Sequence, residues 1–95
     1  MRYRRFLINK NLNFIKNFIE QEFEFCYVSK SLIYEIYLKL GGTDNRLSFN
    51  YYFFKHYGYE TYTGKYLRDN NIEDCNIIKS STNKKLDTYI KVDEH

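Results

Sequence analysis

A dense aromatic stretch, LSFNYYFFKHYGY from Leu47 to Tyr59, constrains the fold of this chain more than any other segment. Phenylalanine and tyrosine bring large apolar rings, and the tyrosine hydroxyl suits both a core boundary and a recognition surface. Leu47 would anchor the start of a helix, Ser48 would cap its free amides, and Gly58 would end it. The pattern therefore predicts a short helix from Phe49 to Tyr57 at the centre of the fold.

The two faces of this predicted helix differ in polarity. Phe49 and Phe53 share one face, which we expect to be buried. The outward positions are Asn50, Tyr51 and Lys55. These residue types contact base edges and phosphates in DNA-binding proteins. A solvated face, a nucleic-acid contact and a protein-protein surface all remain possible for this side of the helix.

Length and composition favour one folded domain. The chain has 95 residues, enough for a single modest core. A hydrophobic content of 43% argues against disorder, although 28% of the residues are charged. The eleven tyrosines accompany abundant Asn, Lys and Ile, and Pro and Trp are absent, as in an AT-rich coding sequence. Tyrosine enrichment alone is therefore weak support for a function.

Two further helices precede the aromatic one. From Asn11 to about Phe25, apolar residues recur at helical spacing and predict a first helix. Its apolar stripe is formed by Leu12, Phe14, Ile15, Phe18, Ile19 and Phe23. Ser29 or Ser31 would cap a second helix that runs to Leu40, where Gly41-Gly42 ends it. Residues 25–28 are interpreted as a short apolar link.

Strands are expected in the C-terminal third. Tyr59 to Thr63 alternates as a strand does, and residues 65–74 would hold a brief helical turn and a polar turn. Residues 76–79 and 87–92 would form two strands of a hairpin joined by the polar loop 80–85. The fold class expected is α+β, with three helices followed by a hairpin wing. Residues 1–10 would be a basic arm, 11–92 the domain and 93–95 a tail.

The charge is uneven along the chain. The net charge is +3 and the sequence pI is about 8.8, which permits attraction to nucleic acid without demanding it. Four cations and no acid occur in the first ten residues: Arg2, Arg4, Arg5 and Lys10. The next segment is acidic, with Glu20, Glu22 and Glu24. The basic start is either a solvated terminus or an arm that lies along phosphates.

The sequence contains no convincing catalytic or metal-binding pattern. Cys26 and Cys75 are too few for a disulfide framework or a zinc cluster, and we interpret both as reduced thiols. His56 has no nucleophile or carboxylate at a local spacing that would tie the two together. Tyr51-Tyr52 is similar to the tyrosine pairs of replication-initiator nucleases, but the metal-binding His-x-His is absent. We expect no enzyme activity, no cofactor and no metal.

The segment VSKSLIYEIYLKL from Val28, followed by Leu47-Ser48 and Gly58-Tyr59, resembles the winged-helix region that ends many viral and phage primase-helicases. In that family a helix of the form V-x-x-S-x-L-Y-x-x-Y precedes a loop, an LS-capped helix and a Gly-aromatic exit into a wing. The resemblance covers about residues 28–59. It implies a winged-helix, nucleic-acid-binding or scaffold module without activity of its own.

The leading hypothesis is a small winged-helix protein, of viral or mobile-element type, that binds DNA. The candidate contact residues are Asn50, Tyr51, Lys55, Lys79, Lys84, Lys85, Arg2, Arg4 and Arg5. The alternative is a protein-interaction module that docks on a host or replication protein through an aromatic surface, including the case of a homodimer. No signal peptide or membrane span is expected, so we predict an intracellular protein, cytoplasmic or nuclear.

Overall fold

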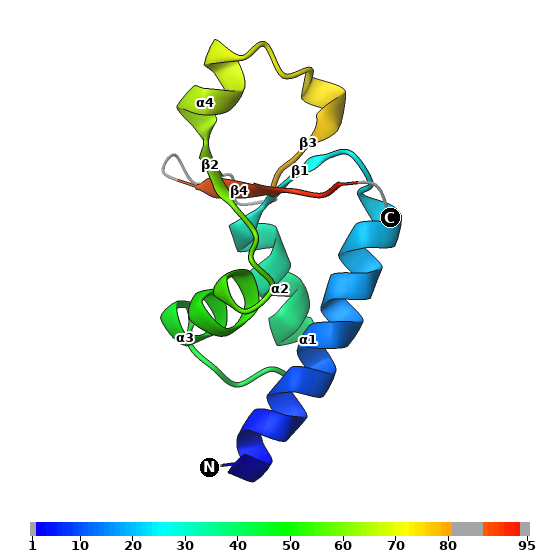
Figure 1. Cartoon of the computed structure of the whole chain (residues 1–95), viewed down its shortest axis with the longest axis vertical. Helices are drawn as coiled ribbons and strands as arrows, with labels where there is room; N and C mark the ends of the chain where they lie inside the picture. The colour runs from blue at the N-terminus through cyan, green and yellow to red at the C-terminus, as the bar shows by residue number, and fades with distance from the viewer. Residues whose placement is uncertain (1, 81–86, 94–95) are drawn as a thin grey trace.

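The computed structural model describes residues 2–80 and 87–93, and for residues 2–11 it describes the backbone alone. Within these ranges the chain forms a small α+β domain with four α-helices and a four-stranded mixed sheet. Helices α1, α2 and α3 lie on one side of the sheet and α4 on the other (Figure 1). The α+β class predicted from the sequence is confirmed.

Helix α1 (Arg2–Glu22) supplies one wall of the core. Leu12, Ile15 and Ile19 are almost fully buried, as their helical spacing predicts. Two other residues of the predicted stripe, Phe14 and Phe18, are exposed instead. The helix begins well before Asn11, so the segment expected to be a basic arm has a helical backbone.

Strand β1 (Tyr27–Ser29) replaces the apolar link expected here, and helix α2 (Lys30–Lys39) follows it directly. The Ser29 Oγ accepts a hydrogen bond from the Leu32 N–H at 3.3 Å, so Ser29 is the N-cap, one of the two serines expected. Gly41 has a φ of +89°, the left-handed turn that glycine accommodates best. The predicted start and end of the second helix are confirmed.

Helix α3 (Arg46–Asn50) continues into a π-helical turn (Tyr51–Lys55), and Gly58 ends the segment with a φ of +70°. The predicted Ser48 cap is wrong. The Asn45 Oδ1 accepts a hydrogen bond from the Ser48 N–H at 2.9 Å, so Asn45 is the N-cap and the helix begins earlier. Leu47 is therefore on the first turn of the helix, 82% exposed, and does not anchor it.

The remaining elements are β2 (Thr61–Thr63), α4 (Gly64–Asp69), a 3-10 turn η2 (Asp74–Asn76), β3 (Ile77–Ile78) and β4 (Thr88–Lys91). The order in the sheet is β2-β4-β1-β3. Strand β4 is antiparallel to both β2 and β1, whereas β3 is parallel to β1.

The hairpin predicted between residues 76–79 and 87–92 is wrong, because β1 lies between β3 and β4. Val28 on β1 and Ile90 on β4 are opposite each other in register and both fully buried. Pairing β1 with β4 places these two apolar side chains next to each other in the main core. A direct pairing of β3 with β4 would separate them. Strand β4 instead forms its second antiparallel pair with β2, from Thr61↔Ile90 to Thr63↔Thr88.

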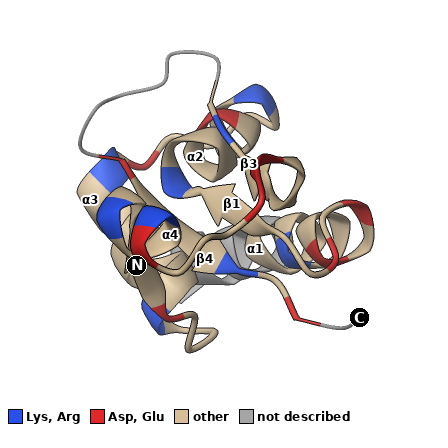
Figure 2. Ribbon diagram, turned by 90° about the horizontal axis from the view of Figure 1, so that it is seen from above, with Lys and Arg blue, Asp and Glu red and all other residues tan. Residues whose placement is uncertain are grey.

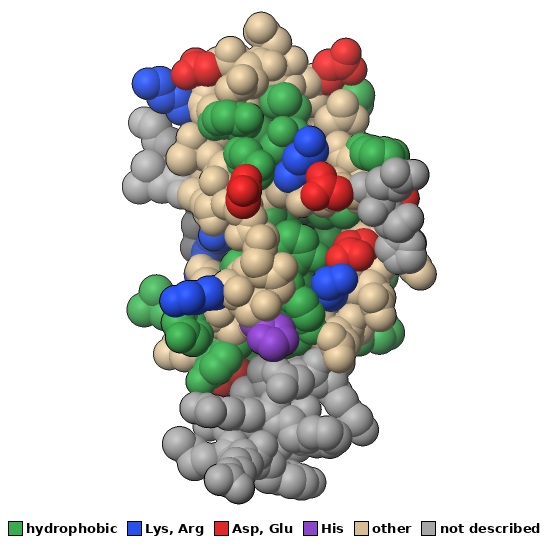
Figure 3. All heavy atoms as spheres, in the orientation of Figure 1, with side chains coloured by type: hydrophobic (Ala, Val, Ile, Leu, Met, Phe, Trp, Pro, Cys, Tyr) green, Lys and Arg blue, Asp and Glu red, His purple; other side chains and the backbone are tan. Residues whose placement is uncertain are grey.

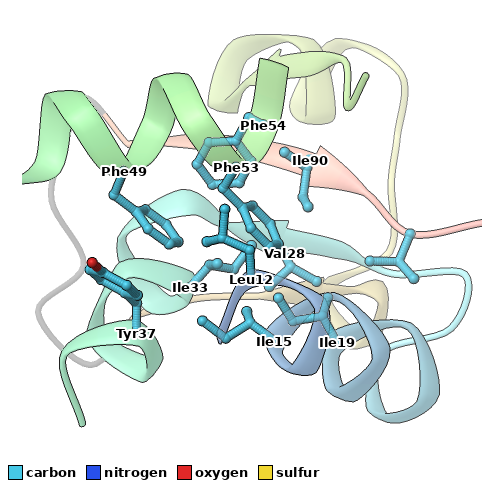
Figure 4. Close-up of a cluster of buried hydrophobic side chains, with 11 residues drawn as sticks. Leu12, Ile15, Ile19, Val28, Ile33, Tyr37, Phe49, Phe53, Phe54 and Ile90 are labelled. Atoms are coloured by element: carbon cyan, nitrogen blue, oxygen red, sulfur yellow. The ribbon is translucent and has the colours of Figure 1, made fainter. Parts of the chain in front are cut away.

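The main core lies between the sheet and the first three helices (Figure 4). The rings of Phe49 and Phe53 stack at 5.3 Å between centroids, and Tyr37 stacks on Phe49 at 4.5 Å. A second, smaller cluster of Tyr27, Leu67 and Tyr89 lies under α4. Because neighbouring strand residues point to opposite faces, the sheet separates the two clusters.

Candidate nucleic-acid interface

The outward side of α3 and its π-helical turn is a ridge of three residues, Leu47, Tyr51 and Lys55, each one turn from the next. Leu47 is 82% and Tyr51 59% exposed, and Lys55 is exposed as well. The Lys55 Nζ lies 4.9 Å from the centroid of the Tyr51 ring, a cation–π distance. This α3 ridge includes two of the three outward positions predicted from the sequence.

The third position, Asn50, does not point outward. Its side chain is half-buried, and its Oδ1 is buried without a hydrogen-bond partner among the described residues. The reason is the width of the buried face: Phe54, one turn after Asn50, is buried together with Phe49 and Phe53. Asn50 lies on the same side of the helix as Phe54 and is partly buried with it. The helix therefore has fewer outward positions than it would have if only Phe49 and Phe53 were buried.

The structure describes only part of the other candidate positions, and the described ones lie apart from one another. Lys79 is exposed after β3, near Ser80, whose Oγ donates a hydrogen bond to Glu35 Oε1 on α2 at 2.8 Å. Lys84 and Lys85 lie outside the described residues. Arg2, Arg4 and Arg5 belong to the N-terminal end of α1, at the foot of the molecule in Figure 1, whereas β3 lies near the other end.

The structure brings together two cations that the sequence analysis missed, Lys30 and Arg46. Lys30 is the first residue of α2 and Arg46 the first residue of α3. The Lys30 Nζ donates a hydrogen bond to Thr61 Oγ1 on β2 at 2.5 Å and lies 4.8 Å from the Phe54 ring centroid. Lys30 therefore joins α2 to β2 and to the turn that carries Lys55.

The Asp87 carboxylate holds this region together. It accepts hydrogen bonds from the hydroxyls of Ser29 and Ser31, the latter at 3.0 Å, and its Oδ1 lies 3.6 Å from the Arg46 Nη2. Arg46 also donates to the Ser31 Oγ at 2.7 Å. The carboxylate is buried just before β4, so it ties the start of that strand to the N-terminal ends of α2 and α3.

Two cations thus face one carboxylate, which leaves a local excess of one positive charge. Burial lowers the pKa of the Lys30 amine, the nearby Arg46 charge lowers it further, and Asp87 partly offsets both effects. The direction of this pKa change indicates that Lys30 lies in an environment that disfavours its charge. A phosphate group placed beside Lys30 and Arg46 would offset the repulsion between their two positive charges.

A signal for these two residues was present in the sequence. Helix N-termini carry a partial positive charge, so the first turn normally favours Asp or Glu and disfavours Lys or Arg. Both α2 and α3 begin with a cation and have no acid in their first turn. The cations at the start of these two helices run against this preference, which suggests that they have a role other than stabilising the helices.

Acids outnumber cations among the side chains that the structure describes. They include nine Lys and Arg and eleven Asp and Glu, a net charge of −2, so the overall +3 arises from residues 2–11 and from the chain outside the described ranges. Lys and Arg positions occur on both α3 and α4, which overlap in Figure 2 but lie on opposite sides of the sheet in Figure 1. The face drawn in Figure 3 mixes both signs with apolar side chains.

No protein-family model, curated protein or solved structure matches this chain. Among the described residues, no group of three or more His, Cys, Asp or Glu is placed to hold a metal ion. Within the same part of the chain, no helix is long and apolar enough to span a membrane. The site therefore has to be interpreted from its own geometry.

Proposed function

We propose that this chain is a winged-helix-like domain that binds DNA through phosphate contacts around α3. The order of its elements supports this: three helices with a short strand β1 after the first, then the antiparallel pair β2 and β4. In this interpretation β2 and β4 are the strands of the wing. Between them the structure describes residues 64–80, which add α4 and the strand β3 that pairs with β1.

The observation that carries the proposal is the pairing of Lys30 and Arg46 beside the α3 ridge. Lys30 contacts both Phe54, next to Lys55, and Thr61 on β2. Cations at the N-terminal ends of two helices, next to a helix that can approach a groove, suit the phosphates that flank that groove.

The proposed contacts bind the DNA backbone more than the bases. Asn50, the residue best suited to hydrogen-bond adenine, has its Oδ1 buried. The ridge offers Leu47 and Tyr51, which can contact thymine methyl groups or sugars but discriminate weakly between bases. We therefore expect modest sequence preference and an affinity that falls with salt. Lys79, Lys84 and Lys85, which lie between β3 and β4 in the sequence, are proposed to add further phosphate contacts.

Titration of a fluorescent duplex at several salt concentrations tests the proposal. The logarithm of the association constant should fall linearly with the logarithm of salt concentration, by about 0.9 per phosphate neutralised. Lys30→Gln should weaken binding to all sequences alike and reduce the slope by about one phosphate's share. Its free energy of unfolding should stay close to wild type, because removing a partly buried charge offsets the lost hydrogen bond.

Lys39→Gln is the matched control, since Lys39 is an exposed lysine at the other end of the same helix. It should leave both the affinity and the slope unchanged. Equal losses from the two variants would point to non-specific attraction by net charge and would contradict the proposed site. Absence of binding at low salt would exclude the DNA-binding function itself.

One observation favours a second function, a protein-interaction module. Leu47 and Tyr51 are among the most exposed large apolar side chains described, and they are adjacent on the α3 ridge. Interfaces are rich in aromatic anchors of this kind. A protein partner retained after nuclease treatment, and lost on Leu47→Glu, would favour this function over DNA binding.

A further inference from the structure

The side of α1 that faces away from the core has a strip of two phenylalanines. Phe14 is 60% and Phe18 39% exposed, and the two lie one turn apart. Phe18 also packs edge-on against Phe23, with 6.4 Å between ring centroids. The core side of the same helix is occupied by Leu12, Ile15 and Ile19. Helix α1 thus has two apolar sides, and the second, the Phe14–Phe18 strip, faces solvent.

The same helix extends past the rest of the fold. Its 21 residues correspond to about 30 Å, in a molecule 44 Å long. In Figure 1 its N-terminal end projects beyond α2 and α3 at the foot of the molecule. Most helices in proteins are stabilised mainly by packing against other elements rather than by intrinsic propensity. A projecting helix with an exposed apolar strip suits a partner helix alongside it.

The charges along α1 specify what kind of partner would fit. The sequence places four cations and no acid at positions 2–10, and Glu20 and Glu22 in the last turn, with exposed Glu24 just after it. A second α1 running in the opposite direction would bring its acidic end beside the basic end of the first. Antiparallel helices also place opposite ends of the helix dipole next to each other.

We propose that the Phe14–Phe18 strip is the interface of a homodimer, in which α1 packs antiparallel against α1 of a second copy. Positions 4 and 22 are 18 residues apart, or five full helical turns, so they fall on the same side of the helix. Their midpoint is residue 13, next to Phe14. A two-fold axis there brings the Arg4 position of each copy to the Glu22 position of the other, because a two-fold interface is self-complementary.

This dimer goes beyond the proposed DNA-binding function and does not depend on it. Helices α1 and α3 lie on opposite flanks of α2 in Figure 1, so pairing of α1 leaves the α3 ridge uncovered in both copies. Arg4 is used in the dimer, and the phosphate contacts proposed above do not require it.

Sedimentation velocity over a range of protein concentrations tests the dimer. The wild-type mass should rise from 11.7 kDa toward twice that value as the concentration increases. Phe14→Glu with Phe18→Glu should abolish the rise, while circular dichroism stays that of a folded domain because both residues are exposed. Leu47→Glu, which removes an even more exposed apolar side chain from α3, should leave the association unchanged.

A charge exchange tests the antiparallel register. Arg4→Glu alone and Glu22→Lys alone each replace two attractive contacts of the dimer with two repulsive ones, and each should weaken association about tenfold. An equimolar mixture of the two variants restores opposite charges at both contacts, and so should associate as tightly as wild type. The double variant should do the same by itself.

A wild-type mass that stays at 11.7 kDa up to about 1 mM, where even weak association is measurable, would overturn the proposal. Association that persists in the double Phe→Glu variant would place the interface elsewhere. A mixture that associates no better than its components would contradict the antiparallel register.

Discussion

Gly42 and Tyr37 fix the turn that joins α2 to α3. The buried Tyr37 ring stacks on Phe49, and its hydroxyl donates a hydrogen bond to Asp44 Oδ2 at 2.9 Å. A Cβ on Gly42 would lie 2.3–2.5 Å from three carbons of that ring. The ring is held at both ends, so it cannot move aside to make room for a side chain.

Gly42→Ala is therefore expected to lower the free energy of unfolding by about 3 kcal/mol, the upper part of the range for overpacked cores. Gly41→Ala serves as the comparison, because its Cβ would meet open space and only its φ of +89° is unfavourable. That variant should cost about 1 kcal/mol. Urea unfolding measures both, and a Gly42→Ala cost no larger than that of Gly41→Ala would contradict the close contact.

Single residues were predicted well where a local rule decides them. The cap at Ser29, one of the two serines expected, and the helix ends at Gly41 and Gly58 follow from backbone chemistry that only nearby residues affect. The half-buried Asn50 and the exposed Phe14 could not be predicted in this way. Which side of a helix is buried depends on the neighbouring elements, and the sequence pattern fitted more than one arrangement.

The sequence-based prediction and the structure differ in which residue caps the first turn of α3. Asn45 and Ser48 are both good N-cap residues, and an apolar residue before Ser48 favoured the wrong one. In the structure the Asn45 side chain accepts the hydrogen bond and the Ser48 N–H donates it. Ser48 is therefore an interior residue of the first turn.

Asn45→Ala should reduce the free energy of unfolding by about 1 kcal/mol, the usual cost of losing an N-cap. Ser48→Ala should have little effect, since alanine is favoured inside a helix. Thermal unfolding of the two variants beside wild type measures the difference. The reverse ranking, with Ser48→Ala the more damaging, would restore the cap expected from the sequence.

Helices were predicted more successfully than strand partners, for a physical reason. A helix is specified by residues within a few positions of each other, whereas β1 and β4 pair across about 60 residues of sequence. Strand β1 has three residues and β3 has two, which is too few to show the alternating pattern by which a strand is recognised in a sequence. The Tyr59 to Thr63 strand was found in part, but its partner β4 was assigned to the wrong neighbour.

At the scale of the whole molecule, the excess positive charge lies outside the set of side chains that the structure describes. The described side chains carry a net charge of −2, while residues 2–10 and the segment with Lys84 and Lys85 supply most of the cations in excess. Under the proposed function, attraction to DNA would therefore come from local arrangements such as Lys30 with Arg46, together with these segments. The number of positive charges alone would not have located that pair.

The central claim is that DNA meets the N-terminal ends of α2 and α3 and the α3 ridge. Backbone amide NMR spectra, recorded while a short duplex is added at low salt, test it most directly. The amide signals of Lys30, Arg46 and Tyr51 should shift together and saturate, while those of Phe14 and Phe18 on α1 stay in place. Shifts confined to α1, or no shift at the start of α2 and α3, would contradict the account.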